Sequence, residues 1–296
     1  MTKMEKTTPP TTPDEITAGV VASFQGCDDD RLREVMVSLV RHLHAFAQEV
    51  GLTQDEWERA IGILTRTGEI TDERRQEFIL WSDSLGLSML VDALEHAVPP
   101  GATESTVRGP FYVPGAPLRE YGEDMSQRLA GVPALVHGRV LDLDGQPIAG
   151  AELDVWQNGE DRLYAVQQPE GPEDHLRGRF ITREDGSYAF LGVRPTAYPI
   201  PYDGPVGAML EATGRHPWRP AHLHMIIRAP GYKTVTTHLF DTTSEYLDSD
   251  AVFAVKPSLV RTFVEHRPDD PDTPAGVTGP WVSLENDLVL VADQRD

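Results

Sequence analysis

The chain has 296 residues, 40% of them hydrophobic and 25% charged, as is usual for a soluble globular protein with a real buried core. Its formal net charge of −21 argues against nucleic acid as a partner, because phosphate binding needs positive surfaces. The single cysteine, Cys27, excludes an internal disulfide and cysteine-rich metal sites, and it favours a reducing cytoplasm. No apolar run is long enough to span a membrane.

The N-terminal third of the chain predicts a helical domain behind a short tail. Residues 1–13 are rich in Thr and Pro and are expected to be disordered. Apolar residues recur with helical spacing over 31–50, and further helices are expected over 55–64 and 72–97. Pro99 and Pro100 end this pattern, so the helical domain is expected to cover residues 14–100.

The remaining residues, 101–296, show the pattern of an all-β domain. Short strands are expected over 134–143, 151–157, 179–182, 187–190, 221–229 and 234–240. Turn dipeptides such as Asp144-Gly145 and Asp185-Gly186 separate them. Short strands divided by such turns predict a β-sandwich, so the expected fold class is mainly β with a helical N-terminal region.

The sharpest local signal for a metal site is a His-x-His pair. On a strand, His222 and His224 project from the same face, so both rings are able to bind one ion. Histidines satisfied within the core or on the surface are the alternative, because such a pair alone is a weak signal. No cysteine is available to complete a site, and residue patterns alone do not single out particular tyrosines from the eight present.

Five stretches of the sequence together match a known family. They lie at residues 103–113, 150–157, 187–190, 198–201 and 214–224, and the last of them is highly specific. The chain resembles the intradiol catechol dioxygenases, and within them the hydroxyquinol 1,2-dioxygenases. The resemblance extends from about residue 15 to about residue 265.

This resemblance implies one ferric ion per subunit, held by Tyr164, Tyr198, His222 and His224. Phenolate oxygen is a hard anionic donor suited to a trivalent cation, and two tyrosinates with a hydroxide balance its charge. An aromatic diol is expected to displace hydroxide and Tyr198, which take up the two substrate protons. The resemblance implies that one oxygen atom of O2 is then inserted between the two hydroxyl-bearing carbons as their bond breaks, that the resulting cyclic anhydride is hydrolysed, and that neither NADH nor flavin is needed.

Two further catalytic residues follow from the resemblance. Arg219 stands three residues before His222 and is expected to stabilise negative charge on the activated ring. His238 occupies a position where catechol-specific members usually carry glutamine, and histidine there resembles the hydroxyquinol branch. An ordinary hydrogen-bonded strand residue is the alternative for His238.

The resemblance also implies a substrate pocket formed by Asp83, Val107, Arg108, Gly109, Pro110, Phe111, Ile200 and Pro201. Asp83 is placed to accept a hydrogen bond from a third ring hydroxyl, and a capping or surface aspartate is the alternative. Arg108 replaces the apolar residue expected in this branch, and inside the pocket it would favour an acidic or halogenated ring. The expected substrate is benzene-1,2,4-triol, with catechol or a chlorinated catechol as the alternative.

The resemblance also implies a homodimer formed through the N-terminal helices, with a phospholipid in the apolar tunnel between them. The stripe from Val35 to Val50 is compatible with this interface, although any packed helix shows the same pattern.

Two other functions are the alternatives to a dioxygenase: a colourless zinc hydrolase and a non-enzymatic β-sandwich binding module. Neither accounts for the spaced Tyr and His motifs.

Overall fold

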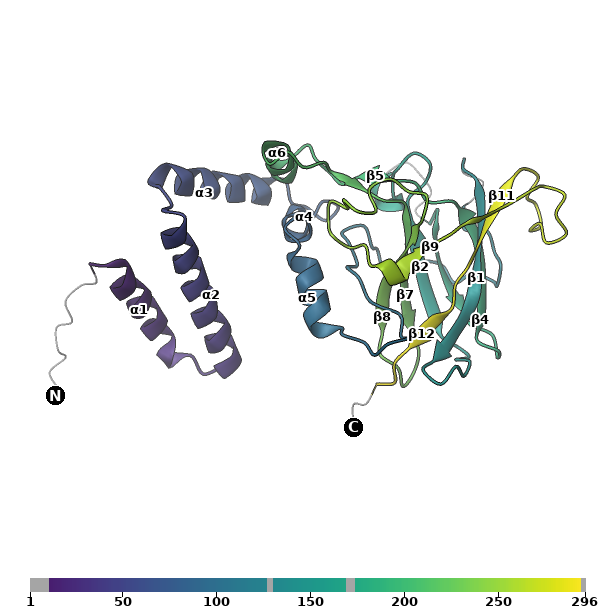
Figure 1. Ribbon diagram of the computed structural model, residues 1–296, viewed down its shortest axis with the longest axis horizontal. Helices are drawn as coiled ribbons and strands as arrows, with labels where there is room; N and C mark the ends of the chain where they lie inside the picture. The colour runs from purple at the N-terminus through teal and green to yellow at the C-terminus, as the bar shows by residue number, and fades with distance from the viewer. Residues whose placement is uncertain (1–10, 127–129, 169–173, 294–296) are drawn as a thin grey trace. The chain divides into compact units, whose positions relative to one another are not determined.

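The computed structural model describes residues 11–126, 130–168 and 174–293, and the chain divides into two compact units, Met1–Thr65 and Arg66–Asp296 (Figure 1). The first unit consists of α1 (Pro13–Ser23), the turn η1 (Phe24–Gly26), α2 (Asp30–Glu49) and most of α3 (Gln54–Glu69). Helix α1 begins at Pro13, which was expected to belong to the tail, because Thr12 and Glu15 form a capping box. Residues 1–10 lie outside the described part of the chain.

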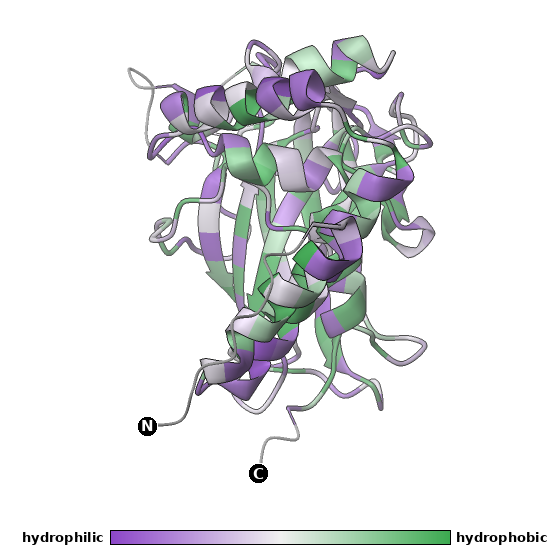
Figure 2. Ribbon diagram, turned by 90° about the vertical axis from the view of Figure 1, so that its left-hand side faces the viewer, coloured by the Kyte–Doolittle hydropathy of each residue, from purple (hydrophilic) through white to green (hydrophobic). Residues whose placement is uncertain are grey.

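The helices of the first unit carry apolar side chains that the chain itself leaves exposed. Figure 2 shows apolar and polar residues mixed along these helices. No described residue of α2 is buried. The apolar stripe along the helix and the residue that follows it is between 44% and 57% exposed, at Leu32, Val35, Leu39, Leu43, Phe46 and Val50. Such a contiguous apolar stripe is typical of a surface that another molecule covers.

The second unit opens with two helices where the sequence predicted one over 72–97. Helix α4 (Glu77–Ser84) ends before α5 (Leu87–Glu95) begins, so the single-helix prediction was wrong. Gly86 adopts a left-handed conformation with φ 76°, which ends the first helix and starts the second. Helical periodicity continues across the break, and for that reason the pattern concealed it.

The strands of the second unit form two five-stranded sheets and a two-stranded sheet (Figure 1). In one sheet β1 (Pro133–Asp142) pairs with β4 (Ser187–Val193), β11 (Trp281–Glu285) and β12 (Leu288–Leu290), and β10 (Val264–His266) lies at an edge. The other sheet has the order β3 (Arg177–Ile181), β2 (Glu152–Gln157), β7 (His222–Arg228), β8 (Val235–Asp241), β9 (Val260–Arg261). The two-stranded sheet joins β5 (Tyr198–Pro199) to β6 (Trp218–Arg219).

Apolar side chains from both large sheets form one core, so the predicted β-sandwich is confirmed. Val136 and Phe190 from the first sheet belong to the same buried cluster as Leu153 and Leu223 from the second. All six expected strands are present with small shifts at their ends. The sequence did not predict α6 (Pro205–Ala212), the turns η2 (Ala165–Gln167) and η3 (Pro257–Leu259), the short strands β5, β6 and β9, or the C-terminal strands β10, β11 and β12.

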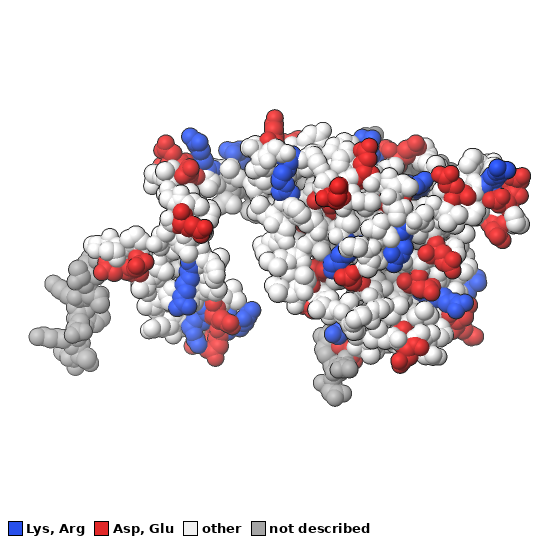
Figure 3. Space-filling view, in the orientation of Figure 1, with Lys and Arg blue, Asp and Glu red and all other residues white. Residues whose placement is uncertain are grey.

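Within the described residues, no helix combines the length and apolar character needed to cross a bilayer. On the face drawn in Figure 3, acidic and basic side chains of the described residues are interspersed, with acidic ones frequent over the second unit.

Candidate metal centre

Strand β7 places two imidazoles on one face of its sheet. Leu223 is fully buried in the sandwich core, so His222 and His224 project from the opposite face, as strand alternation predicts. In the neighbouring strands, Trp156 lies opposite His224 on β2 and His238 lies opposite it on β8. The Trp156 ring stacks on His224 with 4.6 Å between ring centroids, which fixes the orientation of that imidazole.

Two tyrosines reach the same place from separate segments. Tyr164 lies in the loop immediately before η2. Its ring stacks on that of Phe111, with 4.8 Å between the ring centroids. Tyr198 belongs to β5, where it pairs with Arg219 of β6. The rings of Tyr164 and Tyr198 are 5.3 Å apart, and each residue is only 2% exposed.

The donor atoms have the spacing of ligands around a single ion. Tyr164 Oη lies 3.1 Å from His224 Nε2 and 3.4 Å from His222 Nε2, and the two Nε2 atoms are 3.2 Å apart. Metal bonds of about 2.1 Å to N and O donors place neighbouring donor atoms roughly 3.0–3.4 Å apart. Three polar atoms packed this closely in a buried site therefore fit a metal ion between them.

Burial shifts the pKa values of the two histidines and of Tyr164. Burial, followed by the nearby Arg219 charge, holds the pKa of His222 well below its usual range, and the pKa of His224 is lowered chiefly by burial as well. His222 donates its Nδ1 proton to the carbonyl of Pro220 at 2.7 Å, which leaves Nε2 unprotonated, with a lone pair suited to binding a cation. Burial raises the pKa of Tyr164 well above its ordinary value, so only a cation in contact would ionise this phenol near neutral pH.

Arg219 lies directly beside the candidate ligands. Its Nη1 atom is 3.3 Å from Tyr198 Oη and 3.2 Å from His222 Nε2, and its side chain is almost fully buried. Burial works against its charge, yet the pKa of the guanidinium is raised, foremost by Asp250 and then by Tyr198. Arg219 therefore carries a permanent positive charge into the site.

His238 is the third buried imidazole of this group. Its ring centroid lies 4.1 Å from that of His224, and the three histidines alone have the spacing of a possible metal site. Thr106 Oγ1 lies 2.6 Å from His238 Nδ1, whereas His238 Nε2 is buried and finds no hydrogen-bond partner among the described residues. A site formed by three histidines is therefore the geometric alternative to one formed by two tyrosines and two histidines.

A pocket of about 630 Å³ adjoins this centre, and four of the expected substrate residues line it: Asp83, Val107, Arg108 and Gly109. A Cβ atom at Gly109 would stand 3.5 Å from the His224 ring, so the pocket wall touches the candidate ligands. Phe111 packs on the tyrosines, and Ile200 belongs with Val107 to a neighbouring apolar cluster. Pro110 and Pro201 are half-buried and do not line this pocket.

Three residues that were not predicted as site residues contact the side chains of the candidate site. Asp250 forms the ion pair with Arg219, Thr106 bonds His238, and Trp156 covers His224. Trp156 stood within a family-like stretch, so its proximity to the site was a signal available in the sequence. Asp250 and Thr106 lie 31 and 132 residues from their partners, and no local pattern links such distant positions.

Comparison with known families covers both halves of the chain. Residues 29–103 match the family described as catechol dioxygenase N terminus, and residues 107–281 match the family described as dioxygenase. The hydroxyquinol 1,2-dioxygenase of Rhizobium sp. (strain MTP-10005) is 48% identical over 92% of this chain and 92% of that protein. The 6-chlorohydroxyquinol 1,2-dioxygenase of Cupriavidus pinatubonensis is 50% identical over 84% of this chain and 90% of that protein.

Solved structures agree in fold as well as in sequence. Hydroxyquinol 1,2-dioxygenase from Pseudomonas putida DLL-E4 matches with a TM-score of 0.88 and 49% identity, over 95% of this chain and 99% of that one. Catechol 1,2-dioxygenase from Pseudomonas arvilla C-1 matches with a TM-score of 0.83 and 28% identity, over 95% of this chain and 91% of that one. This chain therefore belongs to the intradiol ring-cleavage dioxygenase family.

Proposed function

We propose that this protein cleaves hydroxyquinol, benzene-1,2,4-triol, between its adjacent hydroxyls with O2, giving 3-hydroxy-cis,cis-muconate, the tautomer of maleylacetate. The observation that carries the proposal is the convergence of the Tyr164 oxygen and the two Nε2 nitrogens of His222 and His224 beside a pocket. The relatives named above at 48–50% identity act on hydroxyquinols by name, which favours a triol. Catechol or a chlorinated catechol is the alternative, since relatives at 28% identity carry those names.

Membership of the family implies a non-haem iron. We further propose that it is ferric, that each subunit holds one, and that Tyr164, Tyr198, His222 and His224 bind it. Two phenolates suit a hard trivalent cation and reduce the unbalanced charge in a buried site. When bound, the iron would act as a Lewis acid that the two adjacent substrate oxygens chelate, and it would withdraw electron density from the ring.

The protein's own groups would prepare and protect the reaction. Tyr198 is the proposed acceptor of a substrate proton at its phenolate oxygen. Arg219 Nη1, 3.3 Å from that oxygen, would stabilise negative charge that develops on the ring. If Thr106 donates to His238 Nδ1, the neutral ring carries its proton on Nε2 and would donate it as a hydrogen bond into the site. Phe111 and Trp156, both buried, would keep bulk water away.

The proposed function is tested by oxygen uptake with a panel of benzene diols and triols, together with identification of the product. We expect one O2 consumed per ring, a product opened between the two hydroxyls, and the highest kcat/KM for the triol. A higher kcat/KM for catechol would favour the alternative substrate. No uptake with any vicinal diol in the iron-loaded protein would refute the proposal.

Asp83 is the proposed recognition group for the third hydroxyl. It is 3% exposed at the pocket wall, and burial raises the pKa of its carboxyl. We expect Asp83→Ala to lower kcat/KM for the triol about 10–100-fold, because a lost hydrogen bond to a charged acceptor costs about 1.5–3 kcal/mol. Catechol, which lacks that hydroxyl, should change little. Steady-state kinetics with both substrates check this, and equal losses for both would contradict the role.

Arg108 offers a separate test of substrate choice. It lines the same pocket and lies 5.4 Å from the Tyr112 ring centroid, and the described residues show no ion pair to it. We expect Arg108→Gln to lower kcat/KM for 3,4-dihydroxybenzoate relative to catechol about 3–10-fold, as a partly screened charge-assisted contact would. Arg108→Lys should retain most of the ratio. An unchanged ratio in Arg108→Gln would place the guanidinium outside substrate recognition.

We also propose that the helical domain over 14–100 forms a homodimer, with a phospholipid at the interface, and that the protein is cytoplasmic. The exposed apolar stripe on α2, including Leu39 and Leu43, supports a covered interface. The free Cys27 is compatible with a reducing compartment. Mass measurement in dilute solution, lipid extraction and cell fractionation test these three points separately.

A further inference from the structure

We propose that Asp250 is a positioning residue for the reaction, which holds the Arg219 guanidinium at the distance from Tyr198 that turnover requires. The inference rests on the proposed function, because the position of Arg219 matters only if a diol is oxidised beside it. Asp250 lies outside both the expected ligand set and the expected substrate pocket.

Four hydrogen bonds hold the Asp250 carboxylate. Its side chain is 2% exposed, and Oδ1 and Oδ2 accept from Arg219 Nε and Nη2 at 3.1 Å and 3.4 Å. The backbone N–H groups of Val252 and Ala254 donate to the same two oxygens at 3.3 Å and 3.0 Å. The carboxylate is therefore held from both sides, and its orientation is fixed.

This fork leaves one nitrogen of Arg219 for the site. With Nε and Nη2 bound to Asp250, the guanidinium plane is set, and Nη1 points at Tyr198 Oη and His222 Nε2. Both of those atoms are proposed metal ligands. A guanidinium free of Asp250 would move toward these acceptors and compete with the metal for their lone pairs. Asp250 draws Arg219 back from the opposite side.

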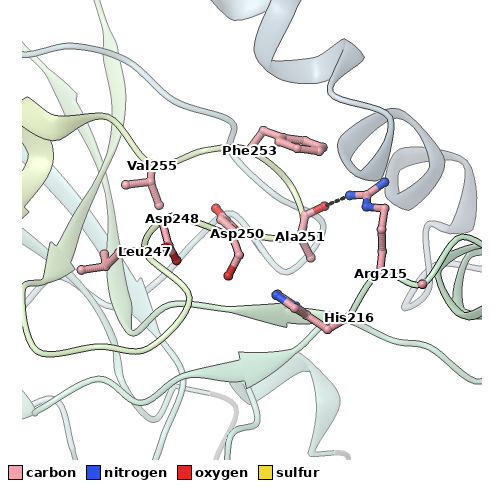
Figure 4. Close-up of a pocket in the computed structure, with 10 residues that line it drawn as sticks. Arg215, His216, Leu247, Asp248, Asp250, Ala251, Phe253 and Val255 are labelled. Carbon is pink, nitrogen blue, oxygen red and sulfur yellow. Dashed lines mark hydrogen bonds between the residues drawn. The ribbon is translucent and has the colours of Figure 1, made fainter.

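The loop that carries Asp250 is itself fixed to the rest of the second unit. Arg215 donates to the carbonyl of Ala251 at 3.0 Å and to the carbonyl of Ser84, the last residue of α4, at 2.7 Å. Figure 4 shows Asp250 in the middle of this loop, between Phe253 and His216, with the Arg215 hydrogen bond beside it. Asp250 is one of the residues of this loop that line a hollow of about 470 Å³.

A purely structural ion pair would make a different prediction. Such a pair only neutralises a buried charge, and its loss lowers stability without changing the site. Asp241, which lies in the same unit of the chain, forms a comparable ion pair with Arg194. Its buried carboxylate accepts from Arg194 Nε at 2.7 Å and from the backbone N–H of Thr243 at 2.9 Å, but Arg194 contacts none of the proposed ligands.

The experiment compares Asp250→Asn, Asp250→Glu and the control Asp241→Asn, each loaded with iron. Thermal unfolding, iron content, kcat, KM and the visible tyrosinate-to-iron absorption band are measured for each. We expect Asp250→Asn to keep its iron, lose at least tenfold in kcat with a smaller change in KM, and shift the absorption band, because Arg219 Nη1 moves relative to Tyr198. Asp250→Glu retains the charge and should recover part of kcat and of the band position.

The outcomes separate the two levels of inference. Asp241→Asn should lose stability yet keep kcat and the band near those of the unchanged protein. If Asp250→Asn behaves as this control does, the positioning role is wrong while the proposed function stands. If Asp250→Asn does not fold, Asp250→Glu decides, and a kcat within twofold with an unmoved band overturns the role. If the unchanged protein oxidises no diol, the proposed function itself has failed.

Discussion

Tyr164→Phe is expected to lose bound iron and its visible colour, and to reduce turnover below detection. The substitution removes one hydroxyl from a ring that packs on Phe111 and Tyr198, so the surrounding packing stays intact. It takes away an anionic donor whose oxygen lies within 3.4 Å of both Nε2 atoms of His222 and His224. Metal analysis, the absorption spectrum and oxygen uptake measure the effect.

Tyr188→Phe is the matched control. Tyr188 is also fully buried, but its hydroxyl donates to the Asn286 carbonyl at 2.7 Å within the sandwich core, away from the proposed ligands. Its loss should cost about 1 kcal/mol of stability, the usual value of one hydrogen bond, and leave iron and turnover unchanged.

The three-histidine alternative makes the opposite prediction. If His222, His224 and His238 bound the metal without a tyrosine, Tyr164→Phe would keep its metal and His238→Gln would lose it. We expect His238→Gln to retain iron, because His238 lies outside the proposed set of two tyrosines and two histidines. Metal content of these two variants distinguishes the ligand sets directly.

Arg219→Ala is expected to retain iron and lose most turnover, by about 10²–10³-fold in kcat, the usual effect of removing one donor that stabilises developing charge. The loss should appear in kcat more than in KM, because the charge develops on the ring only during the reaction. Arg219→Lys keeps the charge but not the planar fork that binds Asp250, so it should recover only part of the rate.

Stability must be measured alongside this variant. Arg219→Ala leaves the buried Asp250 without its partner, and breaking a buried pair in this way costs about 3–5 kcal/mol. Arg194→Ala serves as the control, since it breaks the comparable pair with Asp241, and the Arg194 side chain bonds Asp241 and Thr243 rather than the proposed ligands. Turnover within twofold of normal in folded, iron-loaded Arg219→Ala would reject the catalytic role of Arg219.

The sequence by itself determined the features that depend on local geometry. Strand alternation placed His222 and His224 on one face and Leu223 on the other, because successive side chains of any strand point in opposite directions. Helical spacing located α2, and turn dipeptides located the strands of the sandwich. Periodicity did not reveal the break at Gly86, because a single left-handed residue leaves the hydrophobic pattern almost unchanged.

The tertiary structure alone decided which distant groups meet. Residue patterns did not distinguish Tyr164 and Tyr198 from the other tyrosines, and only the resemblance named them. In the folded chain the Tyr164 hydroxyl lies beside imidazoles 58 and 60 residues away, and Asp250 reaches Arg219 across 31 residues. Such contacts are set by how sheets, loops and hairpins pack, and packing depends on the whole chain rather than on any local period.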